Sequence, residues 1–238
     1  DLESTKNLAL KLDQSGVDIL ELGVPFSDPL ADGPVNQLAA QRGLKSGTNP
    51  EGVLQTVTAI RKESEVPIVL YIYFNLIHHR GLKKFVESAA AAGVDGLLAL
   101  DLPPEEADDY QELMDEAGMA SIWLIAPTTP ENRIKSIAAK GTGFIYYVSR
   151  EGVTGMRGDI AGSLEERIDL IRKHSNLPIA VGFGVSNSDQ VRQVAKFCDA
   201  VVVGSAIVNQ IFNNQNNPHL ASVVSSFVEE LSSPLREI

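Results

Sequence analysis

The chain alternates between helical segments and short apolar segments along nearly its whole length. We predict helices at 2–14, 50–63, 82–92, 105–117, 130–140, 163–174 and 188–196. We predict strands at 17–22, 67–73, 94–100, 120–125, 144–148, 179–181 and 200–203. Apolar strands that are each separated from the next by a helix are typical of a parallel sheet that helices cover. The sequence therefore predicts an α/β protein.

Two α/β architectures fit this alternation, a doubly wound open sheet and a closed (β/α)8 TIM barrel. No Gly-x-Gly-x-x-Gly motif follows an early strand, which weakens the dinucleotide-binding form of the open sheet. Glycine turns at 182–184 and 204–205 follow the last two predicted strands, where a barrel places its phosphate site. We therefore predict one TIM-barrel domain over residues 1–238. Because only seven strands are predicted and the chain does not begin with Met, we expect the first strand to be missing from its N-terminus.

Composition excludes several classes of partner. The 238 residues carry 20 Lys and Arg against 31 Asp and Glu, and the net charge of −11 argues against nucleic acid or an anionic membrane as the main partner. The single cysteine, Cys198, excludes an internal disulfide and favours a reducing cytoplasm, and we expect it in the core. No apolar segment reaches the roughly 18 residues of a membrane span, and the start shows no signal-peptide pattern.

Two carboxyl groups stand at and after the end of the first predicted strand. Glu21 lies between Leu20 and Leu22, where desolvation would raise its pKa toward the range of a useful general acid or base. Asp32 follows in a loop long enough to fold back over the same end of the sheet. Two carboxyls in different environments can divide acid/base and charge-stabilising roles. The alternatives are that Glu21 pairs with a Lys or Arg and that Asp32 only forms a turn.

The late glycine turns suggest where an anion would bind. Gly184 and the Gly204-Ser205 pair offer unhindered backbone N–H groups before predicted helices, which suits a phosphate group. Segment 150–158 is too rich in glycine for a stable helix, and we predict a mobile lid whose Thr154 bonds a loop carboxylate on closure. A disordered surface loop is the alternative.

Other chemistries find less support. No lysine ends a predicted strand, which disfavours a Schiff-base aldolase. The histidines lack metal-ligand spacing, and we expect the His78-His79 pair in a solvated loop. Tyr71, Tyr73 and Tyr146 are expected in the core, although a barrel mouth lined with them would suit a flat aromatic substrate.

Residues 20–34 read LELGVPFSDPLADGP, and this stretch closely resembles the signature of the tryptophan synthase alpha subunit family. Four further segments resemble the family and occur in its order: DLP at 101–103, SREGVTG at 149–155, GFGVS at 182–186 and GSAIV at 204–208. The resemblance extends along essentially the whole chain.

The resemblance implies a TIM barrel that cleaves indole-3-glycerol phosphate to indole and glyceraldehyde 3-phosphate in a cofactor-free retro-aldol reaction. Glu21 would be the acid/base that protonates indole C3, Asp32 would stabilise charge at the ring N–H, and Tyr146 would hold the substrate near Glu21. The implied indole contacts are Leu98, Leu124 and Phe183. The implied phosphate ligands are Gly155, Gly184, Gly204 and Ser205.

The resemblance also implies a partner. Loop 25–33, with Pro25 and Asp28, would face a beta subunit in an α2β2 heterotetramer, and indole would pass to the pyridoxal phosphate of that subunit. A stand-alone lyase and a non-catalytic allosteric partner of a beta subunit stay open as alternatives, whereas the loop disfavours a phosphosugar isomerase. Tyr71 stands where the family usually has an aliphatic residue, which would narrow the indole pocket.

Overall fold

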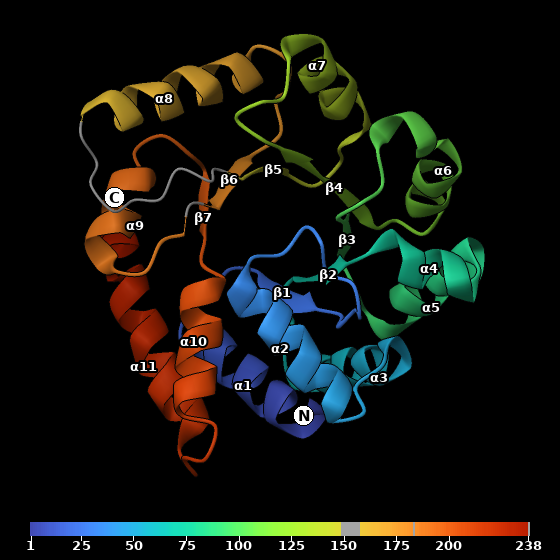
Figure 1. The fold of residues 1–238 in the computed structure, drawn as a ribbon, viewed down its shortest axis with the longest axis vertical. Helices are drawn as coiled ribbons and strands as arrows, with labels where there is room; N and C mark the ends of the chain where they lie inside the picture. Colours follow the sequence, from blue (N-terminus) through green and yellow to red (C-terminus); the bar gives the residue numbers. More distant parts are fainter. Residues whose placement is uncertain (149–157, 183, 238) are drawn as a thin grey trace. The chain divides into compact units, whose positions relative to one another are not determined.

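The structure is a computed structural model that describes residues 1–148, 158–182 and 184–237 (Figure 1). The chain forms two compact units. Unit 1 comprises residues 1–121 and 208–229, and unit 2 comprises residues 122–207 and 230–238. The single domain expected over residues 1–238 stays a prediction.

Unit 1 contains three parallel strands in sequence order, with helices between them. The strands are β1 (Leu20–Gly23), β2 (Ile68–Ile72) and β3 (Gly96–Ala99). The helices are α1 (Leu2–Gln14), α2 (Pro34–Lys45), α3 (Pro50–Arg61), α4 (Phe74–Arg80), α5 (Leu82–Ala92), η1 (Pro104–Glu106) and α6 (Asp108–Glu116). Near the C-terminus, the chain adds to unit 1 most of α10 (Ser205–Asn213) and α11 (Leu220–Ser232).

Unit 2 repeats the same construction. Its parallel strands are β4 (Ala120–Ile125), whose first two residues belong to unit 1, β5 (Ile145–Val148), β6 (Ile179–Gly182) and β7 (Ala200–Val202). Its helices are α7 (Glu131–Lys140), α8 (Gly158–Arg172), α9 (Ser188–Val194) and η2 (Ser233–Glu237). All seven predicted strands are therefore present among the described residues, and their parallel pairing within each unit is confirmed.

The strand register of unit 1 separates a helix-covered face from the opposite face that carries the candidate site. Glu21 pairs with Val69, and Tyr71 pairs with both Gly23 and Leu98. Side chains alternate along a strand and paired residues share a face, so Glu21, Tyr71 and Leu98 lie on one face of the sheet. The opposite face carries Leu20, Leu22, Ile68, Leu70, Ile72 and Leu97, and all of these except Leu22 are buried.

The beginnings of two strands are fixed by an aspartate from a neighbouring connection. Asp95 precedes β3 and accepts the backbone N–H of Ile68 at the start of β2, 2.7 Å away. Asp199 does the same in unit 2, where it accepts the N–H of Ile179 at 2.8 Å. An arginine pairs with each carboxylate, Arg61 with Asp95 and Arg172 with Asp199. Both of these strands begin after a proline, at Pro67-Ile68 and Pro178-Ile179, and the same hydrogen-bonded anchor occurs at each.

One helix end shows why glycine is required. Gly93 ends α5 with a φ of 93°, in the left-handed region that favours glycine. A Cβ atom at this position would lie 2.7 Å from Cγ of Arg61, and Arg61 Nε donates to the carbonyl oxygen of Gly93 at 2.8 Å. Glycine thus lets Arg61 pack across the helix end and reach Asp95.

Three local expectations were wrong. His78 and His79 lie in the last turn of α4 and not in a loop. The carboxylate of Asp101 accepts a hydrogen bond from the N–H of Phe74 and so caps the start of this helix. Asp101 follows β3, so the sequence around residue 74 gives no sign of this cap. Helix α8 begins at Gly158, before the expected start at residue 163. Cys198 is half-buried and does not belong to the core.

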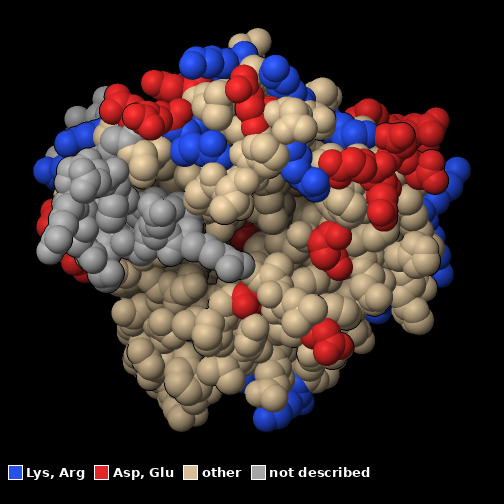
Figure 2. Space-filling view, turned by 45° about the horizontal axis from the view of Figure 1, so that its top comes forward, with Lys and Arg blue, Asp and Glu red and all other residues tan. Residues whose placement is uncertain are grey.

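Charged side chains of both signs lie on the surface (Figure 2). On the face shown in Figure 2, Lys and Arg side chains are interspersed with Asp and Glu side chains. None of the described helices has the length and apolar character that crossing a membrane would require.

Candidate active site

Glu21 lies in β1, on the face opposite the helix-covered one. Solvent reaches part of its side chain, yet protein atoms surround the carboxyl group closely enough to desolvate it, as expected. Burial raises the pKa of Glu21 from 4.5 to about 7, and the negative charge of Asp32 raises it further in the same direction. No basic side chain among the described residues acts on Glu21, so the ion-pair alternative fails.

Asp32 lies in the loop that follows β1 and is half-buried. Its Oδ1 accepts a hydrogen bond from the hydroxyl of Tyr71 at 2.6 Å, and its Oδ2 accepts one from the hydroxyl of Tyr73 at 2.9 Å. The amide of Asn36 makes a longer contact with Oδ1, at 3.4 Å. Each oxygen of the Asp32 carboxylate therefore accepts a hydrogen bond from a phenol hydroxyl. A residue that only formed a turn would not need these two bonds to distant tyrosines.

The same loop is tied down at several points. The N–H of Ala31 donates to the hydroxyl of Tyr73 at 2.9 Å, and the Phe26 ring lies 5.0 Å from the Tyr73 ring, centroid to centroid. Pro25 is buried, and a Cβ atom on Gly43 of α2 would lie 3.3 Å from it. The loop is therefore anchored at its beginning, near Pro25, and near its end, around Asp32.

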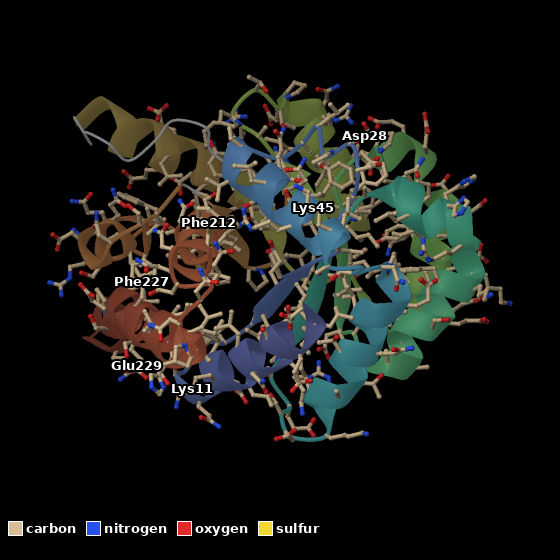
Figure 3. The ribbon with its side chains drawn as sticks, turned by 60° about the horizontal axis from the view of Figure 1, so that its bottom comes forward. Lys11, Asp28, Lys45, Phe212, Phe227 and Glu229 are labelled. Atoms are coloured by element: carbon tan, nitrogen blue, oxygen red, sulfur yellow. The ribbon has the colours of Figure 1, made fainter. Side chains whose placement is uncertain are left out.

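The middle of the loop is open to solvent. Asp28 is exposed and accepts a hydrogen bond from the hydroxyl of Ser27 at 2.9 Å, and the Leu30 side chain is 90% exposed. Figure 3 labels Asp28 and shows α2 beside α10, where Arg42 lies 4.6 Å over the ring of Phe212. The exposed part of this loop thus carries both polar and apolar side chains.

Unit 1 also provides an apolar wall. Leu98 in β3 is fully buried and pairs with Tyr71, so it shares the face that carries Glu21. Both Leu98 and Tyr71 were expected as apolar or aromatic lining. The role of Tyr71 and Tyr73 as donors to Asp32 was missed, because the sequence shows only two tyrosines with one residue between them and no sign of what they face.

Unit 2 contains the second group of predicted site residues. Tyr146 in β5 is 9% exposed and pairs with Leu124 of β4 and Ala180 of β6. A Cβ atom on Gly182 would lie 2.8 Å from the Tyr146 ring, so only glycine leaves room for this ring over β6. Gly182, predicted as part of the phosphate turn, thus has a packing role that the sequence did not reveal.

The predicted phosphate groups of unit 2 lie at two turns after strands. Gly184 is exposed with a φ of 65°, and Gly204 and Ser205 are exposed at the beginning of α10. A helix N-terminus presents unpaired N–H groups that suit an anion. Thr154, Gly155, Phe183 and residues 150–157 of the lid predicted at 150–158 lie outside the described residues, and Gly158 begins α8. Within the described ranges, no cluster of three or more His, Cys, Asp or Glu could hold a metal ion.

The comparisons with known proteins define first the class and then the family. An alpha-subunit structure of tryptophan synthase from Legionella pneumophila superposes with a TM-score of 0.91 at 35% identity, covering 99% of this chain and 88% of the other. A Pyrococcus furiosus structure from the tryptophan synthase α2β2 complex gives 0.90 at 38% identity, covering 98% of this chain and 93% of the other. The chain is thus an α/β protein of the TIM-barrel class.

The sequence relatives give the particular family. The family model described as tryptophan synthase alpha chain matches residues 1–234. A tryptophan synthase alpha chain from Opitutus terrae is 54% identical over 219 residues, covering 90% of this chain and 82% of the relative. One from Geotalea daltonii is 46% identical over 233 residues, covering 98% and 88%. The chain belongs to the tryptophan synthase alpha chain family, and its identification as a lyase of tryptophan biosynthesis is confirmed.

Proposed function

We propose that Glu21 and Asp32 carry out the cleavage of indole-3-glycerol phosphate to indole and glyceraldehyde 3-phosphate. One observation supports this above the others. A carboxyl with a pKa of about 7 lies under the influence of a second carboxylate that two phenols hold in place. Carboxyl groups whose environments differ in this way can divide acid/base and electrostatic roles at neutral pH.

The two carboxyls suffice for the proton transfers of this reaction. Protonated Glu21 donates a proton to C3 of the indole ring, and the charge that develops at the ring N–H is stabilised by the Asp32 carboxylate. The Glu21 carboxylate then accepts the proton of the hydroxyl on the adjacent carbon of the glycerol chain. The carbon–carbon bond breaks, its electron pair restores the aromatic ring, and the aldehyde forms. Glu21 ends the cycle protonated, as it began.

The remaining predicted residues bind the substrate in this proposal. Leu98 and Leu124 contact the indole ring, and the hydroxyl of Tyr146 orients the substrate. The backbone N–H groups at Gly184, Gly204 and Ser205 bind the phosphate. Thr154, Gly155 and Phe183 keep the roles that the family resemblance implies. The chemistry needs no metal or organic cofactor, because both proton transfers are made by one carboxyl.

We also propose a beta subunit as the partner, in an α2β2 assembly. The support is the Pyrococcus furiosus relative, whose structure comes from such a complex. Loop 25–33 suits this contact because exposed Asp28 and Leu30 stand between two anchored ends of the loop. Pyridoxal phosphate would then belong to the partner. The family's biosynthetic role supports a cytoplasmic location.

An indole-release assay tests the function. Purified chain is incubated with indole-3-glycerol phosphate, with and without a beta subunit, and indole is quantified. We expect release by the wild type and a loss of about 10²- to 10⁴-fold in kcat for Glu21→Gln, with substrate still bound. Glu112→Gln, which alters an exposed glutamate of α6, is the matched control and should leave turnover unchanged.

The alternatives give different results in the same assay. A stand-alone lyase would release indole at a rate that the beta subunit does not change. A non-catalytic partner would release none in either condition while it still activated the beta subunit. Substantial turnover by Glu21→Gln would remove Glu21 from the acid/base role.

A further inference from the structure

Tyr71 has a polar role that its place in a core strand conceals. It lies in β2 between buried Leu70 and buried Ile72, yet its own side chain is only half-buried because it points to the opposite face. Its hydroxyl donates to Oδ1 of Asp32 at 2.6 Å, across 39 positions of sequence. At this distance the contact is a short hydrogen bond to a charged acceptor, the strong kind.

Tyr71 and Tyr73 do not play equivalent roles. The hydroxyl of Tyr73 donates to Oδ2 of Asp32 but also accepts the N–H of Ala31, so it holds the loop backbone as well as the carboxylate. Among the residues that the structure describes, the hydroxyl of Tyr71 bonds only to the carboxylate. Its removal would therefore leave Oδ1 only the longer contact with the Asn36 amide, at 3.4 Å, while Tyr73 still anchors the loop.

The position of Tyr71 also links the two carboxyls. Glu21 and Tyr71 lie on the same face of adjacent strands, because Glu21 pairs with Val69 and Tyr71 is two residues further along β2. Burial raises the pKa of the Tyr71 phenol, and its hydrogen bond to Asp32 and the negative charges of Asp32 and Glu21 raise it further. Burial likewise raises the pKa of Glu21, and the charge of Asp32 adds to it. Four titratable groups act on one another here. They are Glu21 in β1, Asp32 in the loop, Tyr71 in β2 and Tyr73, which directly follows β2.

We propose that Tyr71 is a positioning residue that fixes the Asp32 carboxylate beside Glu21, so that Asp32 meets the indole N–H in one orientation. This inference rests on the proposed roles of Glu21 and Asp32. Without the Tyr71 hydroxyl, only the longer Asn36 contact holds Oδ1, so the carboxylate can rotate more about its side-chain bonds. The orientation that stabilises charge at the ring nitrogen is then populated less often. Tyr71 thereby acts on the rate through Asp32.

A double-mutant cycle on the full chain tests this. Tyr71→Phe removes only the phenol oxygen, and kcat for indole release is expected to fall about tenfold, as for loss of a hydrogen bond to a charged group, with KM within twofold. In the Asp32→Asn background the same substitution is expected to change kcat by less than twofold, because the group through which it acts is already altered. Tyr110→Phe removes a buried phenol oxygen from α6 of the same unit and should leave kcat unchanged.

A second measurement does not depend on activity. The carboxyl carbon of Glu21 is titrated by NMR in the wild type, Tyr71→Phe and Tyr110→Phe. Glu21 should titrate near pH 7 in the wild type and Tyr110→Phe, and at lower pH in Tyr71→Phe, where the Asp32 charge is no longer held nearby. If the wild-type protein releases no indole, the proposed function is wrong. The NMR titration of Glu21 would still show whether Tyr71 holds the Asp32 charge near Glu21.

Three results would overturn the inference. The first is a kcat of Tyr71→Phe within twofold of the wild type. The second is an equal loss in the wild-type and Asp32→Asn backgrounds, which would show that Tyr71 acts independently of Asp32. The third is a Glu21 titration that Tyr71→Phe leaves unchanged. If the first result comes with a raised KM, Tyr71 belongs to the lining of the indole pocket.

Discussion

Glu21→Gln should inactivate the enzyme and at the same time stabilise the fold above neutral pH. A carboxyl whose pKa rises from 4.5 to about 7 on folding holds its proton more tightly in the folded state. Between these two pH values the folded protein keeps a proton that the unfolded chain has released, so the free energy of unfolding falls as pH rises. Above about pH 7 the penalty is complete and constant, and below about pH 4.5 it vanishes.

The size of this penalty follows from the pKa difference. Each pKa unit corresponds to about 1.4 kcal/mol, so the full difference would correspond to about 3.4 kcal/mol. Because water reaches the exposed Glu21 side chain and screens its charge, we expect about 1–2 kcal/mol. Glutamine has nearly the same shape and carries no charge, so Glu21→Gln should recover this amount at pH 8 and almost none at pH 4.5.

Urea denaturation at pH 4.5 and pH 8 measures the effect, with Glu112→Gln as the control. The difference in unfolding free energy between Glu21→Gln and the wild type should grow with pH, while Glu112→Gln should show no such growth. An equal difference at the two pH values would refute the argument, because it would mean that the ionisation of Glu21 is not coupled to folding.

Three further perturbations test the site. Asp32→Asn should lower kcat and leave KM unchanged. It should also shift the alkaline fall of kcat/KM, which the loss of the Glu21 proton sets near pH 7, to lower pH, because the Asp32 charge that helps to raise the pKa of Glu21 is gone. An unshifted pH profile would contradict this. Gly182→Ala should destabilise the protein by about 1–3 kcal/mol in urea denaturation, because its Cβ would lie 2.8 Å from the Tyr146 ring; a change below about 0.5 kcal/mol would show that the ring moves freely. Ser205→Ala should raise KM for indole-3-glycerol phosphate about fivefold at constant kcat, as for one lost neutral hydrogen bond, and an unchanged KM would exclude its hydroxyl from phosphate binding.

Local patterns predicted the elements well because each depends on neighbouring residues. The apolar run at residues 120–125 is a strand with the predicted bounds, and helix 82–92 ends at Gly93 as its glycine indicates. The errors occurred where the deciding contact is distant in sequence. Helix α4 begins at Phe74 with its cap supplied by Asp101, so the preceding residues gave no signal and His78 was assigned to a loop.

The site divides in the same way. The sequence by itself placed Glu21 at the end of a strand and Asp32 in a loop that can return to it, because chain order and hydrophobic periodicity are local properties. The tertiary structure decided that Glu21 is exposed yet surrounded by protein, that Asp32 is held by Tyr71 and Tyr73, and that Gly182 makes room for Tyr146. These features depend on strand register and on the return of the loop, which bring together side chains that are far apart in the sequence. Local sequence patterns do not report such contacts, because the residues that make them are not neighbours along the chain.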